Sequence, residues 1–232
     1  MGVKYYSNEH FFETWSPTMA YILGYIYADG SLENASYLRG KYLRVSSTDK
    51  ELINFVKSLL QSDHSIVKLK PTNDLHKIRY LLRIGSYKIF NDLVKLGLHP
   101  NKSLTMKFPI IPKNFLPHFV RGYFDGDGYI GIEKLDGKFK KLNLVFTCGS
   151  KKFLTELAKL LYTVLDLKII RIYDSHRSYR LAYSTSDSVK IFRYIYQDSN
   201  NLFLNRKFQV FKNFFLEYNK WVDNEVLRTI NN

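Results

Sequence analysis

The stretches ILGYIYADG at residues 22–30 and VRGYFDGDG at residues 120–128 decide the fold of this chain. Each stretch is mainly apolar, carries two small residues four positions apart, and ends in Asp-Gly. Residues four apart lie on the same face of a helix, and small side chains there let two helix backbones come close. We therefore expect two helices to pack against each other along a stripe formed by Gly24, Ala28, Gly122 and Gly126.

The aspartate of each stretch, Asp29 or Asp127, occupies an unfavourable position for a negative charge. The glycines that follow, Gly30 and Gly128, suit the left-handed conformation that often ends a helix, so both carboxylates are expected in last helical turns. A helix C-terminus is partially negative and disfavours an aspartate by about 0.3–1 kcal/mol. Adjacent carboxylates also repel each other, and an oxygen-seeking divalent ion such as Mg²⁺ relieves both penalties. Asp-Gly is also an ordinary turn dipeptide, but its repetition in the same setting favours a functional site.

The similarity between the two stretches extends over most of the chain. VSSTDKELINFVKSLL (45–60) resembles FTCGSKKFLTELAKLL (146–161) at an offset of 101 residues, close to the offset of 98 between the two aspartates. Each repeat is expected to contain a helix, two strands, a helix, two strands and a helix, with an antiparallel sheet backed by helices, which is an α+β fold. We place the first half at residues 1–105 and the second at 106–232, joined by a proline-rich linker over about 100–117.

The strands expected in each half carry charged and apolar residues in alternation. Lys68 and Lys70, for example, alternate with Val67 and Leu69. Such alternation places one set of side chains under the helices and the other on an exposed basic face. A basic strand face is often only a solvated surface, but its occurrence in both halves favours contact with a polyanion. The candidates on these faces are Arg44, Lys68, Lys70, Lys77, Arg79, Arg83, Lys141, Asn143, Arg171, Tyr173 and Arg180.

The composition limits the classes of protein that fit the chain. Among 232 residues, 35 Lys and Arg outnumber 21 Asp and Glu, and the formal net charge of +14 favours a polyanionic partner, either nucleic acid or an acidic membrane surface. The single cysteine, Cys148, excludes an intramolecular disulfide, and the six histidines lack the spacing of a zinc site. Because the sequence shows neither a signal peptide nor a membrane-length apolar run, we expect a soluble protein of a reducing compartment, intracellular or organellar.

The two motif stretches and the duplicated plan resemble the LAGLIDADG homing endonucleases, in the single-chain form that carries two motifs. The resemblance covers nearly the whole chain and implies an αββαββα fold in each half, with two antiparallel four-stranded sheets forming a pseudo-two-fold saddle on double-stranded DNA. It implies that Asp29 and Asp127 bind the catalytic divalent ions, with the backbone carbonyls of Ala28 and Gly126 as further ligands. Mg²⁺ is the expected cofactor, Mn²⁺ is expected to substitute for it, and Ca²⁺ to bind without supporting efficient cleavage.

The halves differ at the sixth motif position, where Tyr27 stands in one and Asp125 in the other. The resemblance places no metal ligand there, and the asymmetry suits a target that is not a perfect palindrome. The resemblance also implies a basic residue near each site, in the loop before the last helix of each half, and Lys102 and Lys207 match it, with Arg206 as the other candidate beside Lys207. A lysine there could stabilise charge on the scissile phosphate or orient the attacking water; the alternative is a solvated lysine or a non-catalytic phosphate contact.

The function implied by the resemblance is a double-strand break with short 3′ overhangs in a long DNA target, made by metal-dependent phosphodiester hydrolysis. Two alternatives on the same fold stay open: an intron maturase, which binds intron RNA and assists splicing, and a DNA-binding regulator that has lost cleavage. Because both motifs lie in one chain, we expect a monomer that binds one duplex. Base contacts and phosphate contacts look alike at the level of sequence, so the target does not follow from it.

Overall fold

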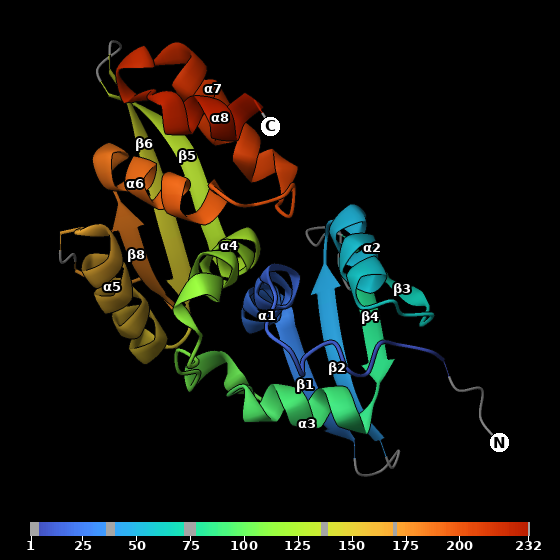
Figure 1. The fold of residues 1–232 in the computed structure, drawn as a ribbon. Helices are drawn as coiled ribbons and strands as arrows, with labels where there is room; N and C mark the ends of the chain where they lie inside the picture. Colours follow the sequence, from blue (N-terminus) through green and yellow to red (C-terminus); the bar gives the residue numbers. More distant parts are fainter. Residues whose placement is uncertain (1–4, 36–39, 72–77, 136–138, 169–170, 232) are drawn as a thin grey trace.

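The computed structural model describes residues 5–35, 40–71, 78–135, 139–168 and 171–231. The first half of the chain has the expected order of helix, two strands, helix, two strands and helix (Figure 1). Its elements are α1 (Pro17–Asp29), β1 (Gly30–Ala35), β2 (Gly40–Ser47), α2 (Lys50–Leu59), β3 (Ile66–Leu69), β4 (Arg79–Gly85) and α3 (Tyr87–Lys95).

The second half repeats this order and then continues into two further helices, α7 (Asn205–Glu217), which packs against β5, and α8 (Asn224–Asn231), which packs against α6. Along the described residues, no helix has the length and apolar character needed to span a membrane. The repeated elements of this half are α4 (Leu116–Asp127), β5 (Gly128–Leu135), β6 (Phe139–Cys148), α5 (Lys151–Leu165), β7 (Tyr173–Asp174), β8 (Tyr179–Tyr183) and α6 (Thr185–Tyr196).

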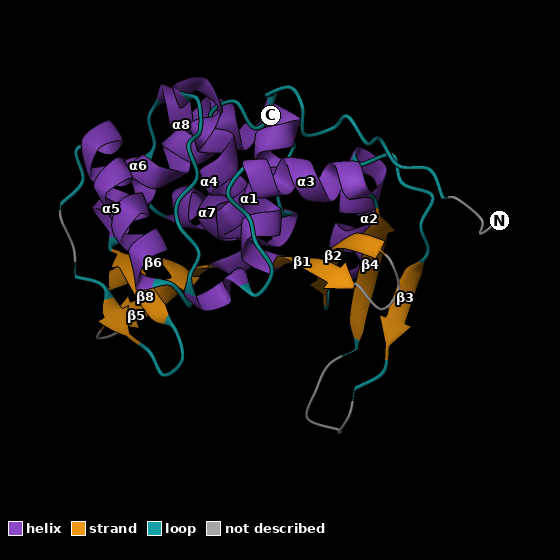
Figure 2. Ribbon diagram, turned by 90° about the horizontal axis from the view of Figure 1, so that it is seen from below, coloured by secondary structure: helices purple, strands orange, loops and turns teal. Residues whose placement is uncertain are grey.

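Each half contributes one four-stranded antiparallel sheet, and the two sheets have equivalent strand orders, β1-β2-β4-β3 and β5-β6-β8-β7. Figure 2 shows both sheets on one side of the molecule and the helices on the other. The side chains under the helices are apolar and fully buried, as with Leu43, Val45 and Leu82 in the first sheet and Leu144 and Phe146 in the second. The α+β architecture predicted from the duplicated pattern is confirmed.

Side-chain caps explain where several helices begin. The hydroxyl of Ser16 accepts a hydrogen bond from the backbone of α1, and Asp49 accepts two from the first turn of α2. Ser86 and Ser150 cap α3 and α5 in the same way. Each cap satisfies backbone N–H groups that have no partner within the helix, so the helix starts are set locally by the sequence.

The motif helices α1 and α4 pack directly against each other between the two halves (Figure 1). A Cβ atom at Gly24 would lie 2.1 Å from the carbonyl oxygen of Phe119, and one at Gly122 would lie 1.9 Å from that of Tyr21. These neighbours are backbone atoms, which cannot turn aside as a side chain can. The close approach of the helices therefore depends on glycine at both positions.

Gly30 and Gly128, which follow the motif helices, are extended rather than left-handed, with φ of −88° and −90°. The left-handed prediction is wrong because a strand begins at each glycine, so the chain passes from helix to strand without a capping loop. Glycine is needed there for space. A Cβ at Gly30 would lie 2.6 Å from Ile26 Cγ2, and one at Gly128 would lie 2.2 Å from the ring of Phe124.

Candidate active site

The carboxyl groups of Asp29 and Asp127 lie at the C-terminal ends of the packed motif helices, and both residues are half-buried. The two ends are in contact, since a Cβ at Gly126 would lie 2.3 Å from the Cβ of Ala28 and 3.5 Å from Asp29 Oδ2. Burial, and then the charge of Asp29, raise the pKa of Asp127 to about 6. Burial also raises the pKa of Asp29. Two carboxyl groups that resist ionising together form a favourable place for a cation.

Lys102 and Lys207 are almost fully buried, with 6% and 4% of their surface exposed. Lys102 begins a short 3₁₀ helix, η2 (Lys102–Leu104), that follows α3, and Lys207 lies in the first turn of α7, which follows α6. The prediction places both lysines in a loop before the last repeated helix of their half, which is α3 or α6. That prediction is wrong, because both lysines come after these helices. The segments that return to the motif helices are the ones leaving α3 and α6.

Each lysine binds carbonyl oxygens at the end of the motif helix of its own half. Lys102 Nζ donates to the carbonyl of Tyr27 at 2.5 Å and more weakly to that of Ala28 at 3.4 Å. A cation at a helix C-terminus neutralises its partial negative charge, so the lysines also compensate for the placement of the two aspartates. The carbonyls that accept from Lys207 Nζ are those of Phe124, Asp125 and Gly128.

The two ammonium groups differ in the donors left for a substrate. An ammonium has three donors. Lys207 uses all three on carbonyls, whereas Lys102 has two acceptors among the described residues and so keeps one donor there. Burial lowers the pKa of Lys102, and the charge of Asp127 opposes that shift more than the charge of Asp29 does. Lys207 in turn lowers the pKa of Asp29 more than Lys102 does. For Lys207, the charge of Asp125 opposes the lowering of the pKa by burial more than that of Asp29 or Asp127 does.

Two tyrosines beneath the carboxylates were missed at the level of sequence. The hydroxyl of Tyr25 is buried, and the neighbouring charge of Asp29 adds to the effect of burial in raising its pKa. The equivalent Tyr123 donates its hydroxyl proton to the carbonyl of Thr147 at 2.7 Å. The signal for both was available, because Tyr follows Gly in each motif. Both rings are buried, and the charges of the nearby aspartates add to the effect of burial in raising the pKa of each tyrosine.

On the open face of the first sheet, arginines cluster around one acidic residue. Arg44 and Arg83 are directly opposite each other on β2 and β4. Glu33 Oε2 lies 3.0 Å from Arg83 Nε and 3.8 Å from Arg44 Nε. The Arg83 guanidinium also lies over the ring of Tyr42, 3.6 Å from its centroid. Arg83 is therefore held in one orientation before any ligand arrives.

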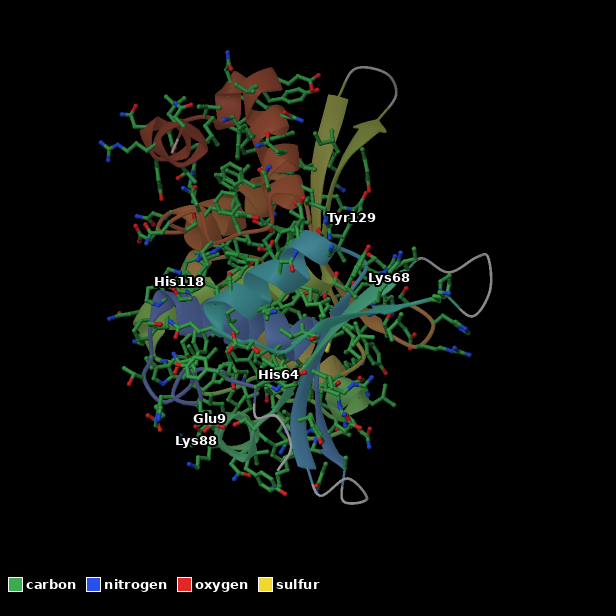
Figure 3. The ribbon with its side chains drawn as sticks, turned by 90° about the vertical axis from the view of Figure 1, so that its right-hand side faces the viewer. Glu9, His64, Lys68, Lys88, His118 and Tyr129 are labelled. Carbon is green, nitrogen blue, oxygen red and sulfur yellow. The ribbon has the colours of Figure 1, made fainter. Side chains whose placement is uncertain are left out.

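The predicted orientation of Lys68 is wrong. In the register of β3 with β4, Lys68 pairs with Tyr80 and Val67 pairs with Leu81, which places Lys68 on the helix side of the sheet. The open face instead carries Val67 and Leu69, which are 50% and 38% exposed. Because β3 is an edge strand at the margin of the helix layer, most of its side chains on both faces stay exposed, and its alternation does not mark a core (Figures 2 and 3).

The remaining candidates of the first half lie towards one end of the sheet. Lys70 is exposed just beyond β3, and Lys77 lies outside the described residues. Arg79, also exposed, begins β4 and donates to the carbonyl and the hydroxyl of Ser46. Its charge opposes the rise that burial causes in the pKa of Asp29, so Arg79 on the open sheet face acts electrostatically on that carboxylate.

The second sheet presents a different set of side chains on its open face. Asn143 Nδ2 donates to Glu133 Oε1 at 2.8 Å, and Lys141 pairs with Glu133 across the strands. Tyr173 pairs with Arg180 at the outer edge. The guanidinium of Arg171 lies 5.9 Å from the centroid of the Tyr173 ring. The acidic residue here holds an amide rather than a guanidinium. Nearby Tyr129, labelled in Figure 3, is 56% exposed.

The donors at the helix ends fit a divalent cation that prefers oxygen. Within the described residues, no group of three or more His, Cys, Asp or Glu side chains could hold a metal ion. An ion between Asp29 and Asp127 would therefore complete its coordination with backbone carbonyls, water or phosphate oxygens. The Ala28 carbonyl accepts a weak hydrogen bond from Lys102, while the Gly126 carbonyl is not among those that Lys207 binds.

Solved structures of homing endonucleases share this fold at low sequence identity. The homing endonuclease I-WcaI, bound to its DNA recognition sequence, is similar with a TM-score of 0.59 and 15% identity, covering 87% of this chain and 91% of that one. I-LtrWI bound to target DNA has a TM-score of 0.58 and 14% identity over 97% of each chain. I-SmaMI, bound to an uncleaved DNA target with calcium ions, has a TM-score of 0.56 and 15% identity, covering 94% and 97%. At this level of identity the similarity shows the fold alone.

One curated sequence is also similar. The Probable translation initiation factor IF-2 of Methanocaldococcus jannaschii is 27% identical over 167 residues. The match covers 69% of this chain but 12% of that protein, so the similarity concerns a small part of a longer polypeptide. The activity of the whole relative does not carry over.

The model of the LAGLIDADG-like domain matches two segments of the chain, residues 16–91 and 114–195. These segments contain both motif helices and both sheets, and together they make up more than half of the chain. Lys102 and Lys207 lie outside them. The resemblance predicted from the two motifs is confirmed, and the chain belongs to the family of LAGLIDADG-like domains, with two of them in one polypeptide.

Proposed function

We propose that this protein is a site-specific homing endonuclease that breaks both strands of a long DNA target by metal-dependent hydrolysis. The observation that carries the proposal is the adjacent pair of half-buried carboxyl groups, Asp29 and Asp127, at the ends of two packed helices between two sheets. The family relationship and the DNA-bound structures of the same fold support double-stranded DNA as the substrate.

Asp29 and Asp127 would hold the divalent ion, with the Gly126 carbonyl and, more weakly, the Ala28 carbonyl as further ligands. Mg²⁺ is the proposed cofactor, Mn²⁺ a substitute, and Ca²⁺ an ion that binds without supporting efficient cleavage. Such an ion, when bound, supplies positive charge beside the scissile phosphate and activates the attacking water. The chain itself contributes the fixed helix ends, which the glycine contacts and the two lysines hold in place.

The two lysines would assist in different ways. Lys102 keeps one donor and can contact a phosphate oxygen or a water molecule directly. Lys207 has all three donors on carbonyls, so it would act through its charge and by fixing the end of α4. Arg79 adds a third cation close to Asp29. In the proposed reaction, these charges would stabilise the negative charge that develops during phosphodiester cleavage.

The two sheets would lie on one duplex, with the halves 1–105 and 106–232 acting as the two domains of a monomer. Arg44, Arg79 and Arg83 are the proposed contacts in the first half, together with exposed Lys70. Each site would cut one strand, leaving short 3′ overhangs. The proposed contacts in the second half are Lys141, Asn143, Arg171, Tyr173 and Arg180.

A cleavage selection on a library of DNA targets tests the proposal. The wild-type protein should cut a subset of targets with Mg²⁺ or Mn²⁺ and bind but not cut them with Ca²⁺. Asp29→Asn and Asp127→Asn should each reduce double-strand cleavage by ~10²-fold or more while leaving binding largely intact. The exposed Asp63→Asn serves as the matched control. Sequence-specific DNA binding without any cleavage would instead identify a regulator, and preferential binding of structured RNA a maturase.

A further inference from the structure

The segments that carry the two lysines are tied to the motif helices by different side chains. The tying residues stand at three positions that the 98-residue offset makes equivalent in the two halves. At two of these positions only one half has a hydrogen-bonding side chain, and at the third the two halves have different ones. The three pairs are Tyr21 and Phe119, Leu23 and Arg121, and Tyr27 and Asp125.

In the second half, Asp125 is the central tie. It is 1% exposed, and its Oδ2 accepts hydrogen bonds from Tyr21 Oη at 2.8 Å and from the backbone N–H of Leu204 at 2.8 Å. Leu204 is the N-cap residue of α7, whose first turn contains Lys207. The motif helix therefore holds the start of the lysine-bearing helix through one carboxylate, and Tyr21 contributes to that hold from the other half.

Arg121 makes a second tie to the same segment. Its guanidinium is fully buried, and it donates from Nε to the carbonyl of Leu202 at 2.7 Å and from Nη1 to that of Ile195 at 2.5 Å. His118 Nδ1 accepts from Nη2 at 2.9 Å. The bonded carbonyls lie near the end of α6 and just before α7, so Arg121 fixes the path of the chain between these helices.

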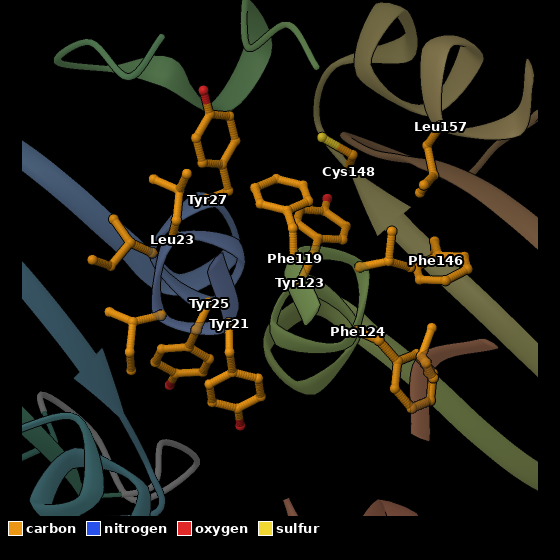
Figure 4. Close-up of a cluster of buried hydrophobic side chains, with 14 of the residues drawn as sticks. Tyr21, Leu23, Tyr25, Tyr27, Phe119, Tyr123, Phe124, Phe146, Cys148 and Leu157 are labelled. Carbon is orange, nitrogen blue, oxygen red and sulfur yellow. The ribbon is translucent and has the colours of Figure 1, made fainter. Parts of the chain in front are cut away.

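The first half makes a simpler tie. Tyr27 Oη donates to the carbonyl of Leu96 at 2.7 Å, immediately after α3 and before Lys102. Figure 4 shows Tyr21 and Tyr27 leaving α1 in opposite directions, with Tyr27 reaching this returning segment. The residues equivalent to the other two ties are Leu23, which has no hydrogen-bonding side chain, and Phe119, whose ring packs 5.3 Å from that of Tyr27.

We infer that Asp125, Tyr21 and Arg121 are positioning residues for Lys207, and that Tyr27 is the positioning residue for Lys102. Where cleavage is concerned, this inference rests on the proposed function. A displaced lysine releases the end of the motif helix that it binds, and each helix end carries one of the two aspartates, so each tie acts mainly on the site of its own half. Loss of a tie should therefore slow the cleavage of one DNA strand more than that of the other.

Hydrogen exchange tests the positioning step without any need for activity. Asp125→Ala removes Oδ2, which accepts both hydrogen bonds, so exchange should rise in residues 197–207 and stay unchanged in 96–102. Tyr27→Phe should do the reverse. Asp125→Asn keeps an oxygen that can accept both hydrogen bonds but removes the charge beside Lys207 and Arg121, so exchange at 197–207 should rise less than in Asp125→Ala. Unchanged exchange at 197–207 in Asp125→Ala would overturn the inference.

Strand-resolved cleavage tests the functional step on a target labelled separately on each strand. Asp125→Ala should slow one strand by about tenfold or more, Tyr27→Phe should slow the opposite strand, and Asp125→Asn should be less unbalanced than Asp125→Ala. Tyr183→Phe, another buried tyrosine away from α1 and α4, is the matched control. If Asp125→Ala does not fold, Tyr21→Phe removes one of the two donors to the carboxylate and gives the same direction in both measurements.

Two results separate the possible failures. Equal slowing of both strands, accompanied by a general rise in exchange, would mean that these residues only support the core, and would overturn the inference. A wild-type protein that cuts neither strand of any target would defeat the proposed function, while the exchange measurements would still decide whether the ties position the two lysine segments.

Discussion

The ends of the two motif helices are closely alike, whereas the open faces of the two sheets differ. Gly24 and Gly122 make equivalent backbone contacts, and an aspartate closes each helix beside a buried lysine. On the sheets, by contrast, Glu33 holds two arginines in the first half, while Glu133 holds an asparagine in the second. The first half also has Arg79 close to the carboxylates.

This difference separates two kinds of task. The parts that are alike place two carboxyl groups side by side, which under the proposed function is the same requirement for both strands of a duplex. The parts that differ would face the DNA, where equivalent side chains would suit only a palindromic target. Under that proposal, the asymmetry of the sheets is what a single chain gains over a symmetric pair of identical subunits.

The most severe test of the shared helix contact is to replace either glycine with a larger residue. Gly24→Leu and Gly122→Leu should each prevent stable folding, with a loss of about 4–5 kcal/mol or more, because both side chains would meet backbone atoms of the other helix. Circular dichroism and urea denaturation measure the effect. Gly85→Leu, at an exposed glycine, is the control. If only one of the two glycines is intolerant, the equivalence of the contact fails.

The sequence predicted the shared parts well because they follow local rules. Small residues at helical spacing, an aspartate before glycine, and a duplicated element order were sufficient to predict the fold, which the structure confirms. The orientation of Lys68 could not be obtained this way, because the alternation of an exposed edge strand carries no information about burial. The ties made by Asp125 and Arg121 also escaped, since their partners are backbone atoms about eighty residues away along the chain.

A second test compares the two buried lysines by stability. Lys207→Met should destabilise the protein by about 3 kcal/mol and Lys102→Met by about 2 kcal/mol, because the first removes three hydrogen bonds to carbonyls and the second removes two, one of them long. Chemical denaturation gives both values, and the exposed Lys113→Met should change little. An effect of Lys102→Met as large as that of Lys207→Met would contradict the difference in donor use.

A third test asks whether the two aspartates resist ionisation equally. The pKa of Asp127 is about 6 in the folded protein against an ordinary value of 3.8, so the folded state holds its proton more tightly and ionisation costs stability as pH rises from about 4 to 6. Without metal, Asp127→Asn should therefore raise the free energy of unfolding at pH 7 by about 2–3 kcal/mol, and by little at pH 4. Thermal melts across this range, with Asp63→Asn as the exposed control, check the prediction.

The outcome for Asp29 bears on the same comparison. Arg79, Lys207 and Lys102 oppose the upward shift in the pKa of Asp29. Lys102 and Lys207 also oppose the shift in the pKa of Asp127, but there the charge of Asp29 adds to the effect of burial. Asp29→Asn should therefore stabilise the metal-free protein less than Asp127→Asn does. A larger gain for Asp29→Asn, or a gain that is independent of pH, would contradict this account of the pair.

The smallest expected effect comes from the acidic residues on the open sheet faces. Glu33→Gln removes a negative charge and releases Arg83 from an ion pair of 3.0 Å, leaving its stacking on Tyr42. Affinity for unrelated DNA should rise slightly, and the ratio of specific to unrelated binding should fall about threefold to tenfold, because a freer arginine contacts phosphates as readily as a base. Glu133→Gln releases only Asn143 and should change unrelated binding by a similar amount but the ratio less. Binding titrations at several salt concentrations separate sequence-specific binding from the electrostatic attraction to any DNA, because that attraction weakens steeply with salt. Equal changes in the ratio for both variants would mean that the orientation of Arg83 does not contribute to target choice.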